Sequence, residues 1–304
     1  MIEARGLTKR YGGTLAVDDL SFSVKPVLVT GFLGPNGAGK TTTLRLILGL
    51  DSPSAGAVTI GGRRYRDLPA PMHEVGALLD AKALHGGRKA YNHLLCLAQS
   101  NGIPRSRVDE VIAVVGLEAV ARRRAGEFSL GMGQRLGIAA ALLGDPGILL
   151  FDEPVNGLDP EGIVWVRTLM RSLAAEGRTV LVSSHLMSEM ALTADHLIVI
   201  GRGRMIADTG IDEFVRSSSQ QSVRVLSPHA SQLSAHLGAA GAVVSVGNDG
   251  ALSVTGMESA AIGQIAAANG LVLHELTPQR ASLEEAFMEL TRDSVEFEAS
   301  ESVR

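Results

Sequence analysis

The stretch that decides the fold reads Gly34-Pro35-Asn36-Gly37-Ala38-Gly39-Lys40-Thr41-Thr42. It fits the phosphate-loop pattern G-x-x-x-x-G-K-[ST], whose glycines let the backbone approach a phosphate closely. The apolar run 27–29 before it is expected to be a strand, and the run 42–48 after it a helix. Backbone N–H groups of such a loop converge on an anion, and the helix N-terminus adds the positive end of its dipole. The stretch therefore predicts a nucleotide-binding site made by all nine residues, with Lys40 on the β- and γ-phosphates and Thr41 on Mg²⁺.

Length and composition limit the remaining possibilities. A chain of 304 residues, 45% hydrophobic and 20% charged, has the size and composition of one large or two smaller globular domains. The net charge of -4 argues against a general nucleic-acid binder. The single cysteine, Cys96, excludes an internal disulfide framework and a cysteine-rich zinc site. No apolar run approaches the length of a membrane span, and we expect a protein in the cytoplasm or at its boundary.

The segment before the helical region reads as strands. Residues 1–30 alternate apolar and polar positions around Gly12-Gly13, which is typical of half-exposed antiparallel strands. Further strands are expected at 57–62 and 75–79, the second ending at Asp80. Residues 81–143 have a mostly helical pattern, in which the run Arg122-Arg123-Arg124 is expected to be a solvated helix face.

An all-apolar run and a second run with an apolar centre are typical of parallel strands buried on both faces. The run 148–151 ends in Asp152-Glu153, and the run 179–183 ends in Ser184-His185. The carboxyl ends of parallel strands meet at one edge of a sheet, where ligand sites form. Asp152 can hold Mg²⁺ through its water shell, and Glu153 can act as general base on a water that attacks the γ-phosphate. His185 can orient that water or donate to the phosphate; a structural hydrogen bond at the strand end is the alternative.

Two helix starts, a hairpin and one aromatic residue complete the pattern. Ser129 is a candidate N-cap for the apolar helix that follows it, and Asp159 with Pro160 can begin the helix that runs to about residue 176. A hairpin is expected around 201–203. Tyr11, beside the first turn, can stack on an adenine ring or pack on the sheet.

At this point the chain closely resembles the ATP-binding subunit of ABC transporters. The matching segments are Walker A at 34–42, the signature at Phe128–Met132 with Gln134 and Arg135, Walker B at 148–153, the D-loop at 157–159, and the switch histidine His185. The resemblance implies an α/β P-loop ABC ATPase core with a mixed sheet, helices on both of its faces, an antiparallel β subdomain and a helical subdomain. It also makes Tyr11 the residue that stacks on adenine.

The resemblance further implies ATP, Mg²⁺ and a head-to-tail homodimer. Each ATP is expected between Walker A of one protomer and the signature of the other, contributed here by Ser129, Leu130, Gly131, Met132 and Gln134. The catalytic residues are then Lys40, Glu153 and His185, the Mg²⁺ ligands are Thr41 and Asp152, and Asp159 belongs to the D-loop.

The sequences of the signature and of the segment 282–287 resemble those of bacterial ABC-2-type exporters. Among these exporters, the drug and antibiotic resistance members have the most similar sequence pattern. In them a separate membrane-spanning permease binds the ATPase, which places this chain on the cytoplasmic face of the membrane, away from nucleic acid. A mechanical or regulatory ABC ATPase outside transport is the alternative; such relatives usually carry two fused ATPase units, a long coiled coil or zinc-binding cysteines, and this sequence shows none of these features.

Two departures from the family pattern stand out. The signature reads Phe-Ser-Leu-Gly-Met where Leu-Ser-Gly-Gly-Gln is commonest, although Ser129 and Gly131 keep the phosphate-facing positions. Asp80 stands where the Q-loop usually begins with glutamine. An aspartate can attract Mg²⁺ but repels the γ-phosphate.

The chain is expected to divide into an ATP-binding domain at 1–215, with its helical subdomain at about 81–143, a linker at 216–221 and an accessory α+β domain at 222–291. Residues 292–304 are a polar tail. The accessory domain reads as strand 222–226, helix 231–237, strands 242–246 and 251–254, helix 258–268, strand 271–276 and helix 282–290. This βαββαβ order is typical of a ferredoxin-like sandwich. We expect a role in binding, docking or dimer support, with binding of a regulatory small molecule as a further possibility.

Overall fold

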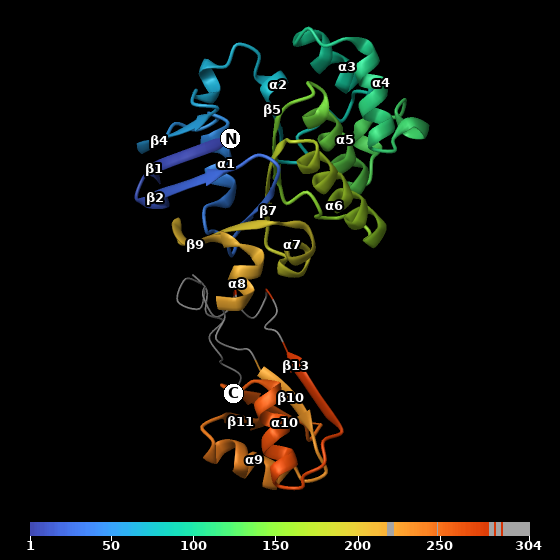
Figure 1. Cartoon of the computed structure of the whole chain (residues 1–304). Coiled ribbons are helices and arrows are strands. Elements are labelled where there is room, and N and C mark those ends of the chain that lie inside the picture. The colour runs from blue at the N-terminus through green and yellow to red at the C-terminus, as the bar shows by residue number, and fades with distance from the viewer. Residues whose placement is uncertain (218–221, 248, 280–282, 284–286, 288–304) are drawn as a thin grey trace, which may run out of the picture. The chain divides into compact units, whose positions relative to one another are not determined.

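The chain folds into two units, Met1–Ile211 and one that begins at Asp212 (Figure 1). The computed structural model describes residues 1–217, 222–247, 249–279, 283 and 287. None of the helices in these ranges is long and apolar enough to cross a membrane.

An antiparallel sheet opens the first unit, in the strand order β2-β1-β4. The strands are β1 (Ile2–Tyr11), β2 (Thr14–Val24) and β4 (Ala55–Ile60). Their inward side chains share one hydrophobic core with the larger sheet, in which the rings of Phe22 and Phe32 lie 5.6 Å apart. The prediction of antiparallel strands in residues 1–30 is confirmed.

The larger sheet has six strands in the order β5-β6-β7-β3-β8-β9. They are β5 (Val75–Leu78), β6 (Ile148–Asp152), β7 (Thr179–Ser184), β3 (Val29–Leu33), β8 (His196–Gly201) and β9 (Arg204–Gly210). All pair in parallel except β9, which forms the predicted hairpin with β8. Every residue of β3, β6 and β7 is buried, which explains why these strands consist of apolar and small residues except for Asp152 at the end of β6.

The prediction that the strand before the phosphate loop begins at Val27 is wrong. Val27 has a left-handed backbone (φ 71°) and a side chain that is 59% exposed, and its N–H donates to the carbonyl of Arg178. The Lys25-Pro26-Val27 segment is therefore a turn that delivers the chain to β3 at Val29.

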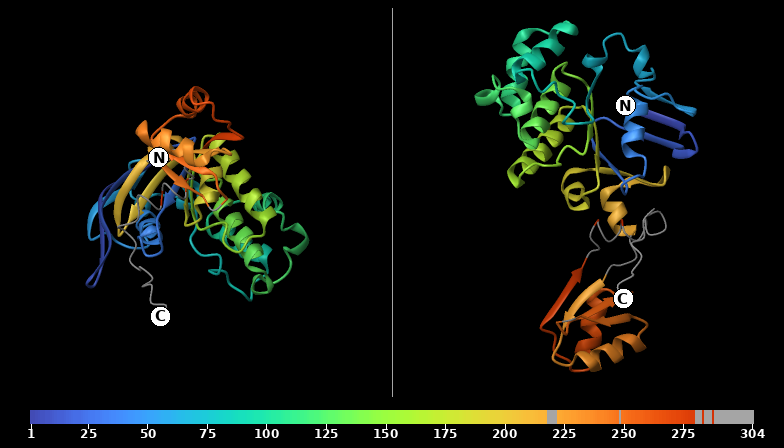
Figure 2. Two further views of the ribbon diagram at one scale, coloured as in Figure 1. Left: turned by 90° about the horizontal axis from the view of Figure 1, so that it is seen from below. Right: turned by 180° about the vertical axis from the view of Figure 1, so that it is seen from behind.

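Helices pack on both faces of this sheet. Those of the core are α1 (Lys40–Ile47), α2 (Pro71–Glu74), α6 (Pro160–Ala175) and α7 (Met187–Thr193), followed by α8 (Ile211–Ser217). The helices α3 (Ala90–Ser100), α4 (Arg105–Val114) and α5 (Leu130–Leu142) gather in one group (Figures 1 and 2).

The arginine run 122–124 is exposed, as expected, but it does not lie on a helix. It connects two short 3₁₀ segments, Glu118–Val120 and Ala125–Glu127, and Arg124 pairs with Lys89 in an isolated β-bridge. Backbone pairing with a distant segment has displaced the helix here.

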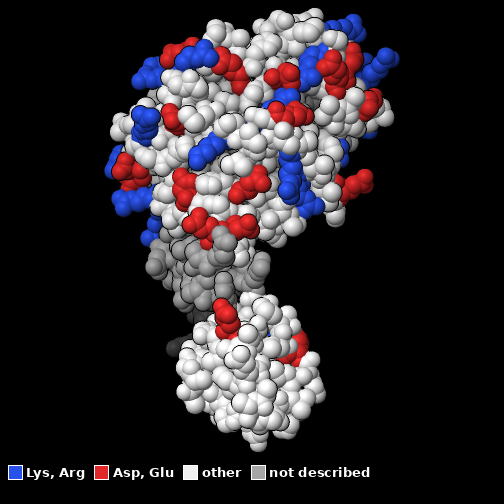
Figure 3. All heavy atoms as spheres, in the orientation of Figure 1, with Lys and Arg blue, Asp and Glu red and all other residues white. Residues whose placement is uncertain are grey.

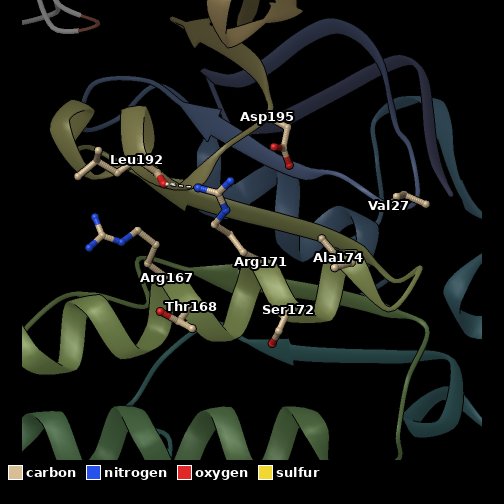
Figure 4. Close-up of a pocket in the computed structure, with 9 residues that line it drawn as sticks. Val27, Arg167, Thr168, Arg171, Ser172, Ala174, Leu192 and Asp195 are labelled. Atoms are coloured by element: carbon tan, nitrogen blue, oxygen red, sulfur yellow. Dashed lines mark hydrogen bonds between the residues drawn. The ribbon is translucent and has the colours of Figure 1, made fainter.

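The second unit contains a four-stranded antiparallel sheet in the order β11-β12-β10-β13. Its elements are β10 (Ser222–Leu226), α9 (Ala230–Ala239), β11 (Val243–Val246), β12 (Leu252–Thr255), α10 (Ser259–Ala268) and β13 (Glu275–Gln279). This order and direction are those of a ferredoxin-like sandwich. The face drawn in Figure 3 carries few charged side chains.

The last strand of this unit was predicted at 271–276 but begins at Glu275. Gly270 (φ 65°) and the bond from Leu271 N–H to the carbonyl of Ala266 close α10, so the chain becomes extended only later. Of the predicted helix 282–290, only Leu283 and Phe287 are described, and both are helical; the rest of it, the linker residues 218–221 and the tail 292–304 lie outside the described residues.

Candidate functional site

The phosphate loop leads from β3 into α1. At two of its glycines the neighbouring backbone leaves no space for a side chain. Gly39 has φ 100°, and a Cβ there would lie 2.4 Å from the carbonyl oxygen of Ala16. A Cβ on Gly34 would lie 2.6 Å from the carbonyl oxygen of Ile200. The loop thus exposes backbone at the N-terminus of α1, which is the cradle that a phosphate requires.

Lys40 lies within this loop and is almost fully buried. Its ammonium donates to the carbonyls of Gly34 at 2.6 Å and Pro35 at 3.2 Å, and it lies 3.9 Å from Oε1 of Glu153. Burial lowers the pKa of Lys40, while the carboxylates of Glu153 and Asp152 act in the opposite direction.

The two side chains predicted to ligate Mg²⁺ are adjacent. The hydroxyl of Thr41 donates to Oδ2 of Asp152 at 2.7 Å, and the hydroxyl of Ser183 donates to the other carboxylate oxygen. Asp152 and Ser183 are opposite one another in the register of β6 and β7. A hydroxyl and a carboxylate at this position form a hard, oxygen-only donor set that suits Mg²⁺.

Glu153 is held at the edge of the sheet between two cationic or donating partners. Its Oε2 accepts from Nδ1 of His185 at 2.8 Å, and its Oε1 faces Lys40. Its backbone is left-handed (φ 49°), and its N–H donates to the carbonyl of Ser183 at 3.2 Å and to the Ser183 hydroxyl at 3.1 Å. The structure therefore brings together the three residues predicted to be catalytic, Lys40, Glu153 and His185.

Gln134, predicted to lie on the surface that meets a second protomer, makes its hydrogen bond within its own protomer. Gln134 is only 4% exposed, and its Nε2 donates to the backbone carbonyl of Glu153 at 2.9 Å. Its Oε1 is buried without a hydrogen-bond partner among the described residues. The side chain thus lies behind Glu153 within its own protomer, because the face of α5 that carries it packs into the core.

The rest of the signature lies at the start of α5. The hydroxyl of Ser129 accepts from the N–H of Met132 at 3.2 Å, which confirms the predicted N-cap. Leu130 is 46% exposed. Gly131 lies close to Leu158 of the D-loop, so that a Cβ there would be 3.2 Å from Cδ2 of Leu158. The signature and the D-loop therefore form one surface.

Asp159 has a local role in the structure. Its Oδ1 accepts from the N–H of Gly162 at 2.9 Å and caps α6, with Pro160 in the first turn as predicted.

Tyr11 and Asp80 lie outside this cluster of contacts. The Tyr11 side chain is 44% exposed, its hydroxyl donates to Oδ2 of Asp51 at 2.7 Å, and the Lys9 ammonium lies 4.8 Å from the ring centroid. The exposed Asp80 accepts from the N–H of Lys82 at 2.7 Å and shares no hydrogen bond with Lys40, Asp152 or Glu153 in the described structure. Adenine stacking and the Q-loop role remain predictions.

For two residues of the site, the sequence did not predict the contacts that the structure shows. Ser183 supports Asp152 and Glu153 at once, and the available signal was its place at the end of a buried strand beside Ser184-His185. The contact of Gln134 with a carbonyl on β6 has no signal in a single sequence, because it depends on how α5 packs.

Comparison with known proteins agrees with this geometry. A family model described as "ABC transporter" matches residues 17–156, and a second, described as a domain of unknown function, matches residues 221–284. The chain is 38% identical over 242 residues to the bacitracin transport ATP-binding protein BcrA of Bacillus licheniformis, covering 75% of this chain and 79% of that protein. It is 34% identical over 214 residues to the lantibiotic transport ATP-binding protein SrtF of Streptococcus pyogenes, covering 70% and 92%.

Solved structures give the same fold. The dimeric structure of MJ0796, a bacterial ABC transporter cassette, aligns with a TM-score of 0.64 at 25% identity and covers 69% of this chain and 99% of that one.

Proposed function

This chain belongs to the ABC transporter family, and we propose that it hydrolyses ATP to drive export through a separate membrane-spanning permease. The observation that carries the proposal is the convergence of Lys40, Thr41, Asp152, Glu153 and His185 at one sheet edge beside the phosphate loop.

Each of these side chains has a chemical role that follows from its contacts. Among the described residues, Lys40 contacts two neutral carbonyls and one carboxylate at 3.9 Å, so the anionic phosphates of ATP can compete for it. Mg²⁺, when bound, supplies positive charge that neutralises the phosphates, and Thr41 and Asp152 are the residues that would hold it. Glu153 accepts the proton of the attacking water, and the Nδ1–H of His185 keeps its carboxylate in place.

The signature surface supports a dimer. Ser129 and Gly131 lie at the N-terminus of a 13-residue helix, and the positive end of the helix dipole there favours an anion. We place the ATP of a second copy there, in a head-to-tail dimer, which makes Leu130 and the D-loop part of the interface.

The names of the relatives narrow the transported class. Bacitracin and lantibiotic transport are the functions stated for BcrA and SrtF. We infer that this chain powers export of an antibiotic or a similar compound, and that it works on the cytoplasmic face of the membrane, where it binds its permease.

The test is the Glu153→Gln variant. It should release phosphate about 10²- to 10⁴-fold more slowly than the wild type, because it lacks the general base. It should still bind ATP and elute as a dimer in size-exclusion chromatography with ATP and Mg²⁺. Glu161→Gln, which removes an exposed carboxylate from the first turn of α6, is the matched control. Normal phosphate release by Glu153→Gln would defeat the proposed chemistry, and a monomer in the presence of ATP would defeat the proposed dimer.

A further inference from the structure

Two segments of the helical region, 86–91 and 121–126, run antiparallel to each other. Four backbone hydrogen bonds join them: Ala90 N–H to Arg123 O, Tyr91 N–H to Ala121 O, Ala125 N–H to Arg88 O, and Gly126 N–H to Gly86 O, at 2.8–3.0 Å. The pairing places Lys89 opposite Arg124. Five cationic residues thereby meet on one short ribbon, which we call the basic ribbon: Arg88, Lys89, Arg122, Arg123 and Arg124.

The charges of this ribbon are mostly uncompensated. Lys89 and the three arginines are exposed, and Arg88 is half-buried. Among the described residues, the one ion pair of the ribbon joins Arg123 to Glu127 at 3.7 Å. The pKa of His93 is lowered, first by burial and then by the positive charges of Arg88 and His85, which is consistent with a positive local potential.

The ribbon also concentrates the charge asymmetry of the chain. Residues 81–143 contain nine Lys and Arg and four Asp and Glu, a net charge of +5 in a chain whose total is -4. The rest of the chain is therefore net -9. A region with this excess of positive charge is attracted to an anionic surface.

We propose that the basic ribbon binds anionic phospholipid headgroups at the membrane surface. The backbone groups of the ribbon are used in its own pairing, so what it offers to a partner is long cationic side chains with little fixed geometry. Such side chains recognise charge density, as a fluid anionic bilayer presents it, more than shape. A nucleic-acid-binding chain is usually basic overall, whereas this chain has a net charge of -4.

The inference extends the proposed function, since it gives the ATPase a membrane contact in addition to its permease. It does not require hydrolysis, so the two can fail separately. The measurement is co-sedimentation of the purified full chain with vesicles of phosphatidylcholine alone or mixed with phosphatidylglycerol, in the absence of ATP. We expect binding only to the phosphatidylglycerol vesicles, and a decrease in binding with added salt.

The variant Arg122→Gln/Arg123→Gln/Arg124→Gln should bind these vesicles about 10- to 100-fold more weakly. The matched control, Arg63→Gln/Arg64→Gln/Arg66→Gln, removes the same charge from three exposed arginines near β4 and should bind as the wild type does. If thermal unfolding shows that the first variant is poorly folded, Arg88→Gln/Lys89→Gln on the opposite segment gives the same test.

Equal losses in the ribbon and control variants, or unchanged binding by the ribbon variants, would overturn the proposal. So would equal binding of the wild type to both kinds of vesicle. A ribbon variant that binds vesicles normally but no longer associates with permease-containing membranes would assign the ribbon to an acidic protein segment instead.

Discussion

The side-chain amide of Gln134, on α5, donates to the backbone carbonyl of Glu153 at 2.9 Å. Ser183 accepts from the N–H of the same residue, so both peptide groups of Glu153 are fixed. This matters because Glu153 has a left-handed backbone (φ 49°), a conformation that costs a non-glycine residue about 1–2 kcal/mol. The signature helix thus helps to hold the general base in a conformation that it would otherwise avoid.

Replacing Gln134 with Met keeps the approximate size of the side chain and removes the donor. The lost bond to a buried carbonyl is worth about 1 kcal/mol, so we expect turnover to fall by about fivefold. ATP affinity should change little, because Gln134 makes no hydrogen bond to the phosphate loop in the described structure. Phosphate release and equilibrium binding of a fluorescent ATP analogue separate the two effects. Gln99→Met, at an exposed position on α3, is the control; a parallel fall in affinity would contradict the positioning role.

Most of the fold was predictable from the sequence. The buried strands β6 and β7, the caps Ser129 and Asp159, and the hairpin of β8 and β9 follow from local patterns, and all are confirmed. Local patterns failed at Val27, where an apolar residue lies in a turn. They also failed at the arginine run 122–124, whose conformation is set by pairing with residues more than thirty positions away.

The site was predictable as a set of residue types but not as a set of contacts. Phosphate loop, Asp152-Glu153 and His185 each follow a strand of the same sheet, so that their convergence could be inferred. The hydrogen bond between Gln134 and Glu153 and the support of Asp152 by Ser183 depend on packing between elements. A single sequence carries no periodicity that reports them.

The burial of Lys40 gives the nucleotide-free protein a specific pH dependence. Burial lowers the pKa of this lysine below 10.5, so the folded state binds the proton more weakly than the unfolded chain does. The charge therefore costs folding free energy at neutral pH, and that cost disappears as the pH rises through the folded-state pKa toward 10.5. Relative to Lys40→Met, the wild type should gain thermal stability over this range.

The measurement is thermal unfolding of both proteins without nucleotide at a series of pH values up to 10.5. Groups other than Lys40 titrate in both proteins, so their contributions largely cancel in the difference between the two melting temperatures. A difference in melting temperature that stays constant with pH would show that the buried charge carries no cost. Added ATP should stabilise the wild type alone, because the variant lacks the phosphate ligand.

Gly157 tests the contact between the D-loop and the signature. Its φ is 74°, and a Cβ there would lie 2.1 Å from Cδ2 of Leu130. Gly157→Ala should lower stability by about 1–3 kcal/mol through backbone strain together with this overlap. Leu130→Ala in the same chain removes the two closest atoms, Cδ2 and Cγ, but leaves the backbone strain. The double variant should therefore recover only part of the lost stability in urea unfolding. Full recovery of the lost stability would mean that the positive φ at residue 157 costs nothing. No recovery would mean that the overlap with Leu130 does not contribute to the loss.

Substitutions of Asp80 test whether a negative charge in the loop after β5 affects ATP hydrolysis. Its carboxylate already accepts from the N–H of Lys82 at 2.7 Å. In the predicted Q-loop role, this anion would repel the γ-phosphate of a bound ATP. Asp80→Gln should leave ATP affinity nearly unchanged and raise turnover about two- to tenfold, since it removes this repulsion.

The paired variant Asp80→Asn separates charge from loop geometry. Asn is also neutral but keeps a short side-chain oxygen that can accept from Lys82 N–H, whereas Gln is one methylene longer and loses this local turn. A similar rise in turnover for both variants would assign the effect to charge, and a change in Gln alone would assign it to the turn. Turnover that is unchanged in both, measured by phosphate release at saturating ATP, would remove Asp80 from the catalytic site.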